Sequence, residues 1–171
     1  HRDLHSFPTR RSSDLIEKSI IHKSNVANSL TKMNDGIILH KIFSKIKFKE
    51  KFDIQKLISE SNQDEKEFLS GYAENFEKLF NDRKVTDWFR EQNGVEVKIE
   101  KPVINEDGDE IRPDRVVINK GGVEIIDFKT SKGLNHQEQL KKYKQYYKEL
   151  GYKNIKTYLV YINDNIVEEV N

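Results

Sequence analysis

Hydrophobic residues along this chain change their spacing about halfway, from a helical pattern to a strand pattern. In the first half they recur every three or four positions, which predicts amphipathic helices. The predicted helices cover 16–33, 37–46, 54–60, 64–81 and 85–90. Asn34-Asp35-Gly36 is expected to form a turn or N-cap before the second of them, and Asp53 is expected to cap the third. Trp88 and Phe89 follow helical spacing, which favours core packing over stacking against nucleic-acid bases.

The second half predicts strands, interrupted by one helix. Val95–Val103 alternates apolar and polar residues, as a half-buried strand does, and Asn105–Gly108 resembles a hairpin turn. The other predicted strands are Ile111–Ile118, Val123–Lys129, Ile155–Ile162 and Ile166–Val170. A helix over Gln137–Leu150 separates the second and third of these. Helices, strands, a crossover helix and further strands together indicate an α/β fold with a mixed sheet flanked by helices.

The stretch Ile111–Thr130 contains the most informative chemistry. Its two strands are joined at Gly121-Gly122, which suits a tight hairpin, and the second strand is apolar enough to be covered on both faces. Asp127 and Lys129 interrupt that apolar run and share one face, because side chains alternate along a strand. Asp114 on the neighbouring strand is placed to join them. The group fits either a hard divalent cation beside a phosphate or a buried ion pair without a catalytic role.

Composition narrows the function classes. The 171 residues suit one domain, and the absence of cysteine excludes disulfides, thiolate zinc sites and iron–sulfur clusters. Lack of cysteine also fits a reducing, cytoplasmic location. The net charge of +1 gives no overall basic surface, so binding to nucleic acid would need a local patch. No apolar run approaches the roughly 20 residues of a membrane span.

The first fifteen residues differ in character from the rest. HSFPTRRSSDL, from His5 to Leu15, resembles one reading frame of a sequencing-library adapter, so we expect 1–15 to be a disordered scar outside the fold. A genuine flexible tail is the alternative. The scar would make the remainder a C-terminal fragment of a longer protein. Within it, we expect a helical region at 16–94 and a core at 95–171 that forms one domain with 34–94.

The chain contains RPDRVV…IIDFKT, which resembles the PD-(D/E)xK nuclease signature in the form that its RecB-type branch has. That branch is found at the C-terminus of UvrD/AddA-like helicase–nucleases. GIILHKIF resembles the branch's G-x-x-x-H helix, QLKKY resembles its Q-x-x-x-Y motif, and Glu100 is similar in position to a glutamate that precedes the first aspartate. The resemblance covers His40 and then Glu100 to the end of the chain, and it implies a restriction-endonuclease-like core.

The resemblance also implies roles for individual residues. The ligands of Mg²⁺ or Mn²⁺ would be His40, Asp114, Asp127 and the Phe128 carbonyl. The catalytic residues would be Asp114, Asp127 and Lys129. The substrate-binding residues would be Thr130, Gln139 and Tyr143. Simpler explanations remain open: His40 as a surface or capping residue, Glu100 on a solvated strand face, and Tyr143 in the buried stripe Leu140, Tyr143, Tyr147 and Leu150. Lys141, Lys142, Lys144 and Lys148 fit a solvated helix face or a DNA-backbone contact.

The function that the resemblance implies is a Mg²⁺-dependent DNA nuclease of exonuclease type, acting in double-strand break repair and recombination. Its partners would be DNA, the helicase portion of a parent chain and a second helicase–nuclease subunit. The chain has no G-x-x-x-x-G-K-[ST] loop, so we expect no ATP hydrolysis by it. One alternative is an inactive nuclease-fold module with a structural or DNA-binding role. The other is a fragment that does not fold alone.

Overall fold

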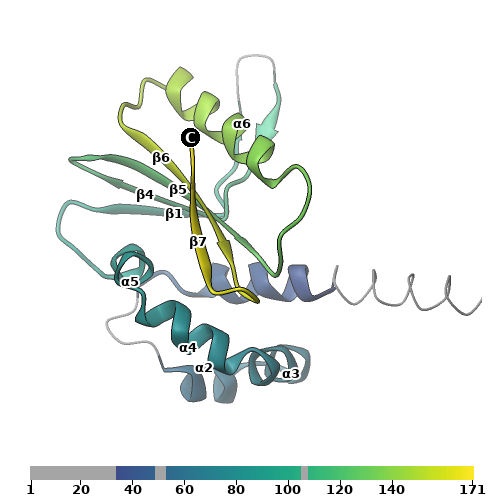
Figure 1. Cartoon of the computed structure of the whole chain (residues 1–171). Helices are drawn as coiled ribbons and strands as arrows, with labels where there is room; N and C mark the ends of the chain where they lie inside the picture. Colours follow the sequence, from purple (N-terminus) through teal and green to yellow (C-terminus); the bar gives the residue numbers. More distant parts are fainter. Residues whose placement is uncertain (1–33, 49–52, 105–107) are drawn as a thin grey trace, which may run out of the picture. The chain divides into compact units, whose positions relative to one another are not determined.

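The computed structural model describes residues 34–48, 53–104 and 108–171. The predictions for 1–15, for 16–33 and for the hairpin turn at 105–107 therefore lie outside the described residues. Asp35–Asn171 form one compact unit. Within it, a five-stranded mixed sheet has helices on both faces, as the sequence predicted (Figure 1). No helix in the described part of the chain is long and apolar enough to cross a membrane.

In the part that the structure describes, the helical region contains a helix over 34–45, called the histidine helix below, and four short helices after it. These are α2 (Ile54–Glu60), α3 (Gln63–Gly71), α4 (Ala73–Asn81) and α5 (Arg83–Phe89). Asp53 caps α2 as predicted, because its side chain accepts a hydrogen bond from the Lys56 N–H at 3.0 Å. The predicted turn or N-cap at 34–36 is wrong, since these residues are already helical.

The predicted helix at 64–81 is divided into α3 and α4. Tyr72 has φ −113° and ψ 12°, outside the helical range, and it follows Gly71, which has low helix propensity. The break between the two helices lets both bury their apolar faces. The rings of Phe68 and Phe76 meet edge to face, with their centroids 6.4 Å apart. Tertiary packing therefore overrides a sequence pattern that is continuous through this point.

The sheet has the strand order β1-β4-β5-β6-β7. These strands are β1 (Glu96–Ile99), β4 (Arg115–Asn119), β5 (Gly122–Lys129), β6 (Ile155–Tyr161) and β7 (Ile166–Val170). Neighbouring strands are antiparallel except β5 and β6, which are parallel and connected through α6 (His136–Glu149). A separate two-stranded sheet pairs β2 (Val103–Ile104) with β3 (Glu110–Ile111).

Three local predictions in the sheet region are wrong. The expected strand Ile111–Ile118 is interrupted at 112–114, so Asp114 lies in a bend between β3 and β4 and not within a strand. The expected strand Val95–Val103 is interrupted at Glu100, where φ is +44°. The hairpin turn consists of Lys120 and Gly121, one residue earlier than predicted, because Gly122 already pairs with Asn119. Gly122 has φ +145°, and a Cβ there would collide with the backbone carbonyl of Asn154. Only glycine satisfies both conditions.

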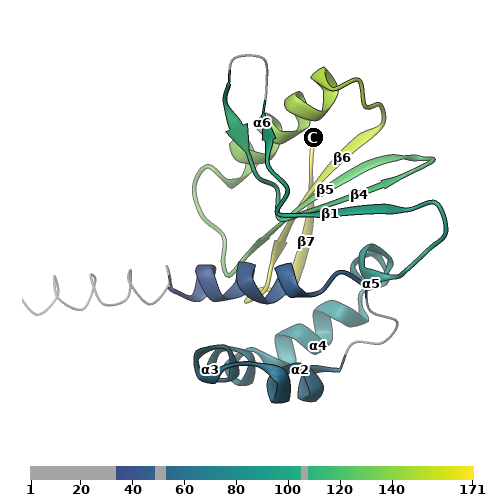
Figure 2. The same ribbon diagram turned by 180° about the vertical axis from the view of Figure 1, so that it is seen from behind.

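β5 lies between two apolar layers, which confirms that it is covered on both faces. The histidine helix and α2–α5 cover one face, and α6 covers the other (Figures 1 and 2). Trp88 and Phe89 belong to the first layer and are 2% and 1% exposed, as expected for core residues. In α6, Leu140, Tyr143 and Tyr147 are buried as predicted, but Leu150 is 55% exposed because it follows the end of the helix.

Candidate metal centre

The histidine helix is attached to β5 by aromatic stacking. The rings of Phe43 and Phe128 lie parallel, with an interplanar angle of 3° and centroids 3.8 Å apart. Leu39 and Ile42 are fully buried on the same helix. His40 lies three residues before Phe43, less than one helical turn away, so this packing brings it to the end of β5.

A buried carboxylate provides a second attachment for this helix. Glu65 in α3 is 1% exposed and lies 2.7 Å from the ammonium of Lys45 and 3.1 Å from that of Lys41. The hydrogen bond from Lys45 is the main cause that lowers the pKa of Glu65 to about 2. Glu65 also forms a capping box with Asn62, so the start of α3 and the histidine helix share one acidic group.

Asp114 connects the histidine helix with β5. Its Oδ1 lies 2.8 Å from His40 Nδ1, and its Oδ2 accepts a hydrogen bond from the Phe128 N–H at 2.7 Å. Asp114 is 8% exposed and lies in the bend just before β4. The hydrogen bond with Asp114 is the main cause that raises the pKa of His40.

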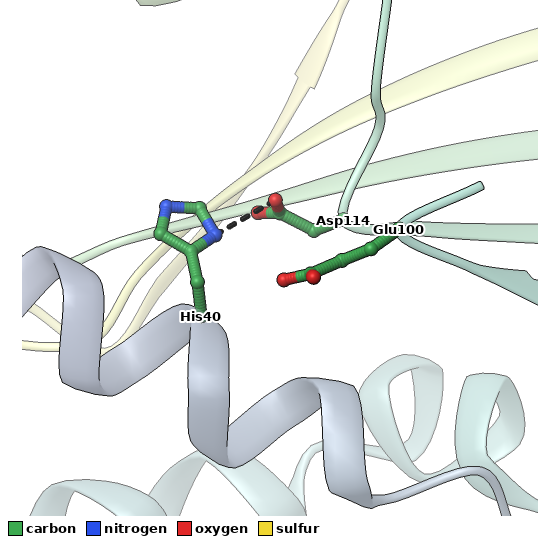
Figure 3. Close-up of side chains that lie close together, drawn as sticks. All are labelled: His40, Glu100 and Asp114. Atoms are coloured by element: carbon green, nitrogen blue, oxygen red, sulfur yellow. Dashed lines mark ion pairs between the residues drawn. The ribbon is translucent and has the colours of Figure 1, made fainter. Parts of the chain in front are cut away.

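Glu100 is directed to the same place by the interruption of β1. Ile99 pairs with Arg115, and one residue further the Glu100 N–H donates to the Asp114 carbonyl at 3.1 Å. The positive φ of Glu100 is uncommon for a residue with a side chain and often marks a functional position. Figure 3 shows the carboxylates of Glu100 and Asp114 directed toward the imidazole of His40. One ligand atom from each of the three lies within 4.8 Å of the other two.

Asp127 and Lys129 form the predicted pair on one face of β5. The Lys129 ammonium lies 2.7 Å from Asp127 Oδ2, and the two side chains are 17% and 1% exposed. Burial is the main cause that raises the pKa of Asp127 to about 6, and the charge of Asp114 adds to it. Lys129 opposes both effects. Asp127 is therefore a buried carboxylate whose ionised form is costly without further positive charge.

Gln139 and Tyr143 share one face of α6, as their spacing predicted. Gln139 Nε2 donates to the Tyr143 hydroxyl at 2.6 Å, and that hydroxyl donates to the Arg112 carbonyl at 3.4 Å. Burial raises the pKa of Tyr143 to about 12, and the negative charge of Asp127 contributes to the rise. Thr130 directly follows β5, and its carbonyl accepts from the Asn163 N–H at 2.9 Å.

The structure thus brings His40 to Asp114, and Asp127 to Lys129, at one end of β5. Among the described residues, the cluster with metal-ligand spacing comprises His40, Glu100 and Asp114, and Asp127 is not a member. Glu100 had been left open by the sequence, because alternation along a strand does not reveal where the strand ends. The Phe128 carbonyl as a ligand stays a prediction.

One buried residue near the site was missed entirely. Arg115 is 1% exposed and follows Asp114 directly, at the start of β4 and just before the apolar residues Val116, Val117 and Ile118. A charged residue within the run RVVI was the available signal, because an arginine is almost never fully buried without partners.

Carboxylate and imidazole groups are ligands that bind Mg²⁺ and Mn²⁺ in proteins. The spacing of His40, Glu100 and Asp114 fits such an ion, and the buried Asp127 nearby favours additional positive charge. The sequence matches no protein-family model, and it matches no curated protein significantly.

Proposed function

We propose that this chain is a metal-dependent DNA nuclease domain with a restriction-endonuclease-like core of the RecB-type branch. It hydrolyses phosphodiester bonds as part of a helicase–nuclease in double-strand break repair. The observation that carries the proposal is the convergence of His40, Glu100 and Asp114 beside the buried Asp127–Lys129 pair. The strand order of the sheet, in which α6 connects the parallel strands β5 and β6, supports the fold assignment.

The metal ligands in this proposal are His40, Glu100 and Asp114, with Asp127 beside them. A bound Mg²⁺ or Mn²⁺ supplies Lewis-acid polarisation of a phosphate oxygen and activation of a water molecule. Asp114 uses its second oxygen to hold the Phe128 amide, so its orientation is fixed before any ion binds. The backbone of Glu100 is held beside Asp114 by the hydrogen bond from its N–H to the Asp114 carbonyl.

Asp127 and Lys129 act as a pair in this mechanism. With a pKa of about 6, Asp127 is mostly ionised at pH 7.5 and accepts a hydrogen bond from the attacking water. The Lys129 ammonium keeps Asp127 in place and stabilises negative charge on the phosphate. Gln139, Tyr143 and Thr130 contact the DNA strand, with the Tyr143 hydroxyl held by the Gln139 amide.

The test is cleavage of linear single- and double-stranded DNA by the full chain in Mg²⁺, Mn²⁺ or EDTA. We expect metal-dependent cutting that falls by at least roughly 100-fold in Asp114→Ala. Asp53→Asn is the matched control, since it removes a carboxylate from the exposed cap of α2 and leaves the cap intact. Cutting that survives EDTA or Asp114→Ala would refute the proposal. A folded protein that binds Mn²⁺ and DNA without cutting would favour the inactive module.

A further inference from the structure

Arg115 is a buried cation whose partners are backbone carbonyl groups. Its Nη1 donates to the Ile46 carbonyl at 2.8 Å, its Nε donates to the Trp88 carbonyl at 3.0 Å, and its Nη2 donates to the Lys47 carbonyl. The guanidinium also lies 4.0 Å from the centre of the Phe89 ring. Burial lowers the pKa of Arg115 to about 10, which leaves the group charged at neutral pH.

These three carbonyl groups lie where two helices end. Ile46 and Lys47 directly follow the histidine helix, and Trp88 is in the last turn of α5. The last carbonyl groups of a helix have no intrahelical donor, and a cation there also interacts favourably with the helix dipole. Arg115 therefore caps both helix ends from the strand that carries Asp114.

The capping contact controls a distance that matters for the metal centre. Ile46 is six residues after His40, about 9 Å along a helix axis, while Arg115 is adjacent to Asp114. Because Arg115 holds the end of the helix, it also sets the position of His40 relative to Asp114. The stack of Phe43 on Phe128 packs the helix against β5, and the hydrogen bonds from Arg115 to Ile46 and Lys47 tie the end of the same helix to β4.

We propose that Arg115 is a positioning residue for the metal centre: it sets the histidine helix along its axis so that His40 reaches Asp114. The inference rests on the proposed function only in taking His40 and Asp114 as metal ligands. Lysine cannot replace Arg115 in this role, because the three N–H groups of an ammonium diverge from a single nitrogen. They cannot reach carbonyl oxygens spaced around a planar guanidinium, and an ammonium has no flat face to lie on Phe89.

The test measures Mn²⁺ affinity of the full chain, from the electron paramagnetic resonance signal of free Mn²⁺, in a double-mutant cycle. The variants are Arg115→Met, Arg115→Lys, His40→Ala and His40→Ala combined with each Arg115 change. We expect Arg115→Met to weaken Mn²⁺ binding roughly 10- to 100-fold, the range for groups that orient metal ligands. In the His40→Ala background we expect no further loss, because Arg115 acts through His40.

Thr157→Val is the control for general loss of stability. Thr157 is 1% exposed and donates to the Val170 carbonyl at 2.5 Å, between β6 and β7, so its loss removes a buried hydrogen bond without touching the histidine helix. We expect its Mn²⁺ affinity to equal that of the wild type. If Arg115→Met does not fold, Arg115→Lys carries the test.

Amide hydrogen exchange in EDTA adds a measurement that needs no metal. In Arg115→Lys, we expect amides of residues 40–46 to lose protection while those of β5 and β6 keep it. Wild-type Mn²⁺ affinity in the Arg115 variants, an equal loss in the His40→Ala background, or unchanged exchange would each overturn the inference. A chain that shows the coupling but cuts no DNA would instead refute the nuclease proposal and leave this inference standing.

Discussion

Replacing Asp127 with asparagine should stabilise the metal-free protein at neutral pH. The ionised carboxylate is buried and faces the charge of Asp114, which together raise its pKa from 3.8 to about 6 despite Lys129. A difference of this size corresponds to about 3 kcal/mol of unfolding free energy. Asparagine imitates the neutral acid in shape and avoids that cost. We therefore expect a gain of about 3 kcal/mol at pH 8.

The direction of the pH dependence follows from the sign of the shift. Because the folded-state pKa of Asp127 is raised, the protonated carboxyl contributes to the free energy of unfolding. That contribution is complete below about pH 3.8 and is lost as pH rises through about 6. The advantage of Asp127→Asn over the wild type should thus be absent near pH 3.5, grow between pH 4 and 6, and stay constant above pH 7.

Urea denaturation in EDTA at pH 3.5, 5 and 8 measures this difference. Comparing variant with wild type at each pH removes contributions that both share, such as the titration of His40. Asp53→Asn makes the same chemical change at the exposed N-cap of α2 and should shift stability little at any pH. An Asp127→Asn protein that is no more stable than the wild type at pH 8, or whose advantage does not grow with pH, would refute the reasoning. DNA cleavage in Mg²⁺ should be lost in the same variant.

Three further predictions concern the groups that hold the site together. Glu100→Gln should weaken Mn²⁺ binding by at least about tenfold, since it removes a charged ligand; calorimetric titration checks this, and an unchanged affinity would exclude Glu100 from the centre. Phe43→Ala should cost about 3–5 kcal/mol of unfolding free energy by leaving Phe128 without its stacked partner, and urea denaturation showing under 1 kcal/mol would contradict this. Glu65→Gln should destabilise the protein at pH 7. Because the folded-state pKa of Glu65 is lowered, its contribution to the free energy of unfolding is present above about pH 4.5 and lost as pH falls toward about 2. Denaturation at pH 7 and pH 2 tests this, and an equal difference at both would show that the ion pairs with Lys41 and Lys45 do not carry it.

The sequence by itself determined features that depend on local spacing. Period-two alternation placed Asp127 and Lys129 on one face of a buried strand, and i, i+4 spacing placed Gln139 beside Tyr143. The cap at Asp53 and the helical core residues Trp88 and Phe89 follow from equally local rules. These predictions hold because the backbone geometry of one element is enough to fix them.

Only the tertiary structure decided how remote segments meet. The contact of His40 with Asp114 requires the histidine helix to dock on β5 through Phe43, which no local pattern specifies. Glu100 enters the centre because the chain takes a positive φ directly after β1, where the Glu100 N–H bonds to the Asp114 carbonyl. Arg115 finds its three carbonyl partners only after two helices end beside β4. Their positions come from directed contacts between segments far apart in the chain, and spacing along one segment carries no information about such contacts.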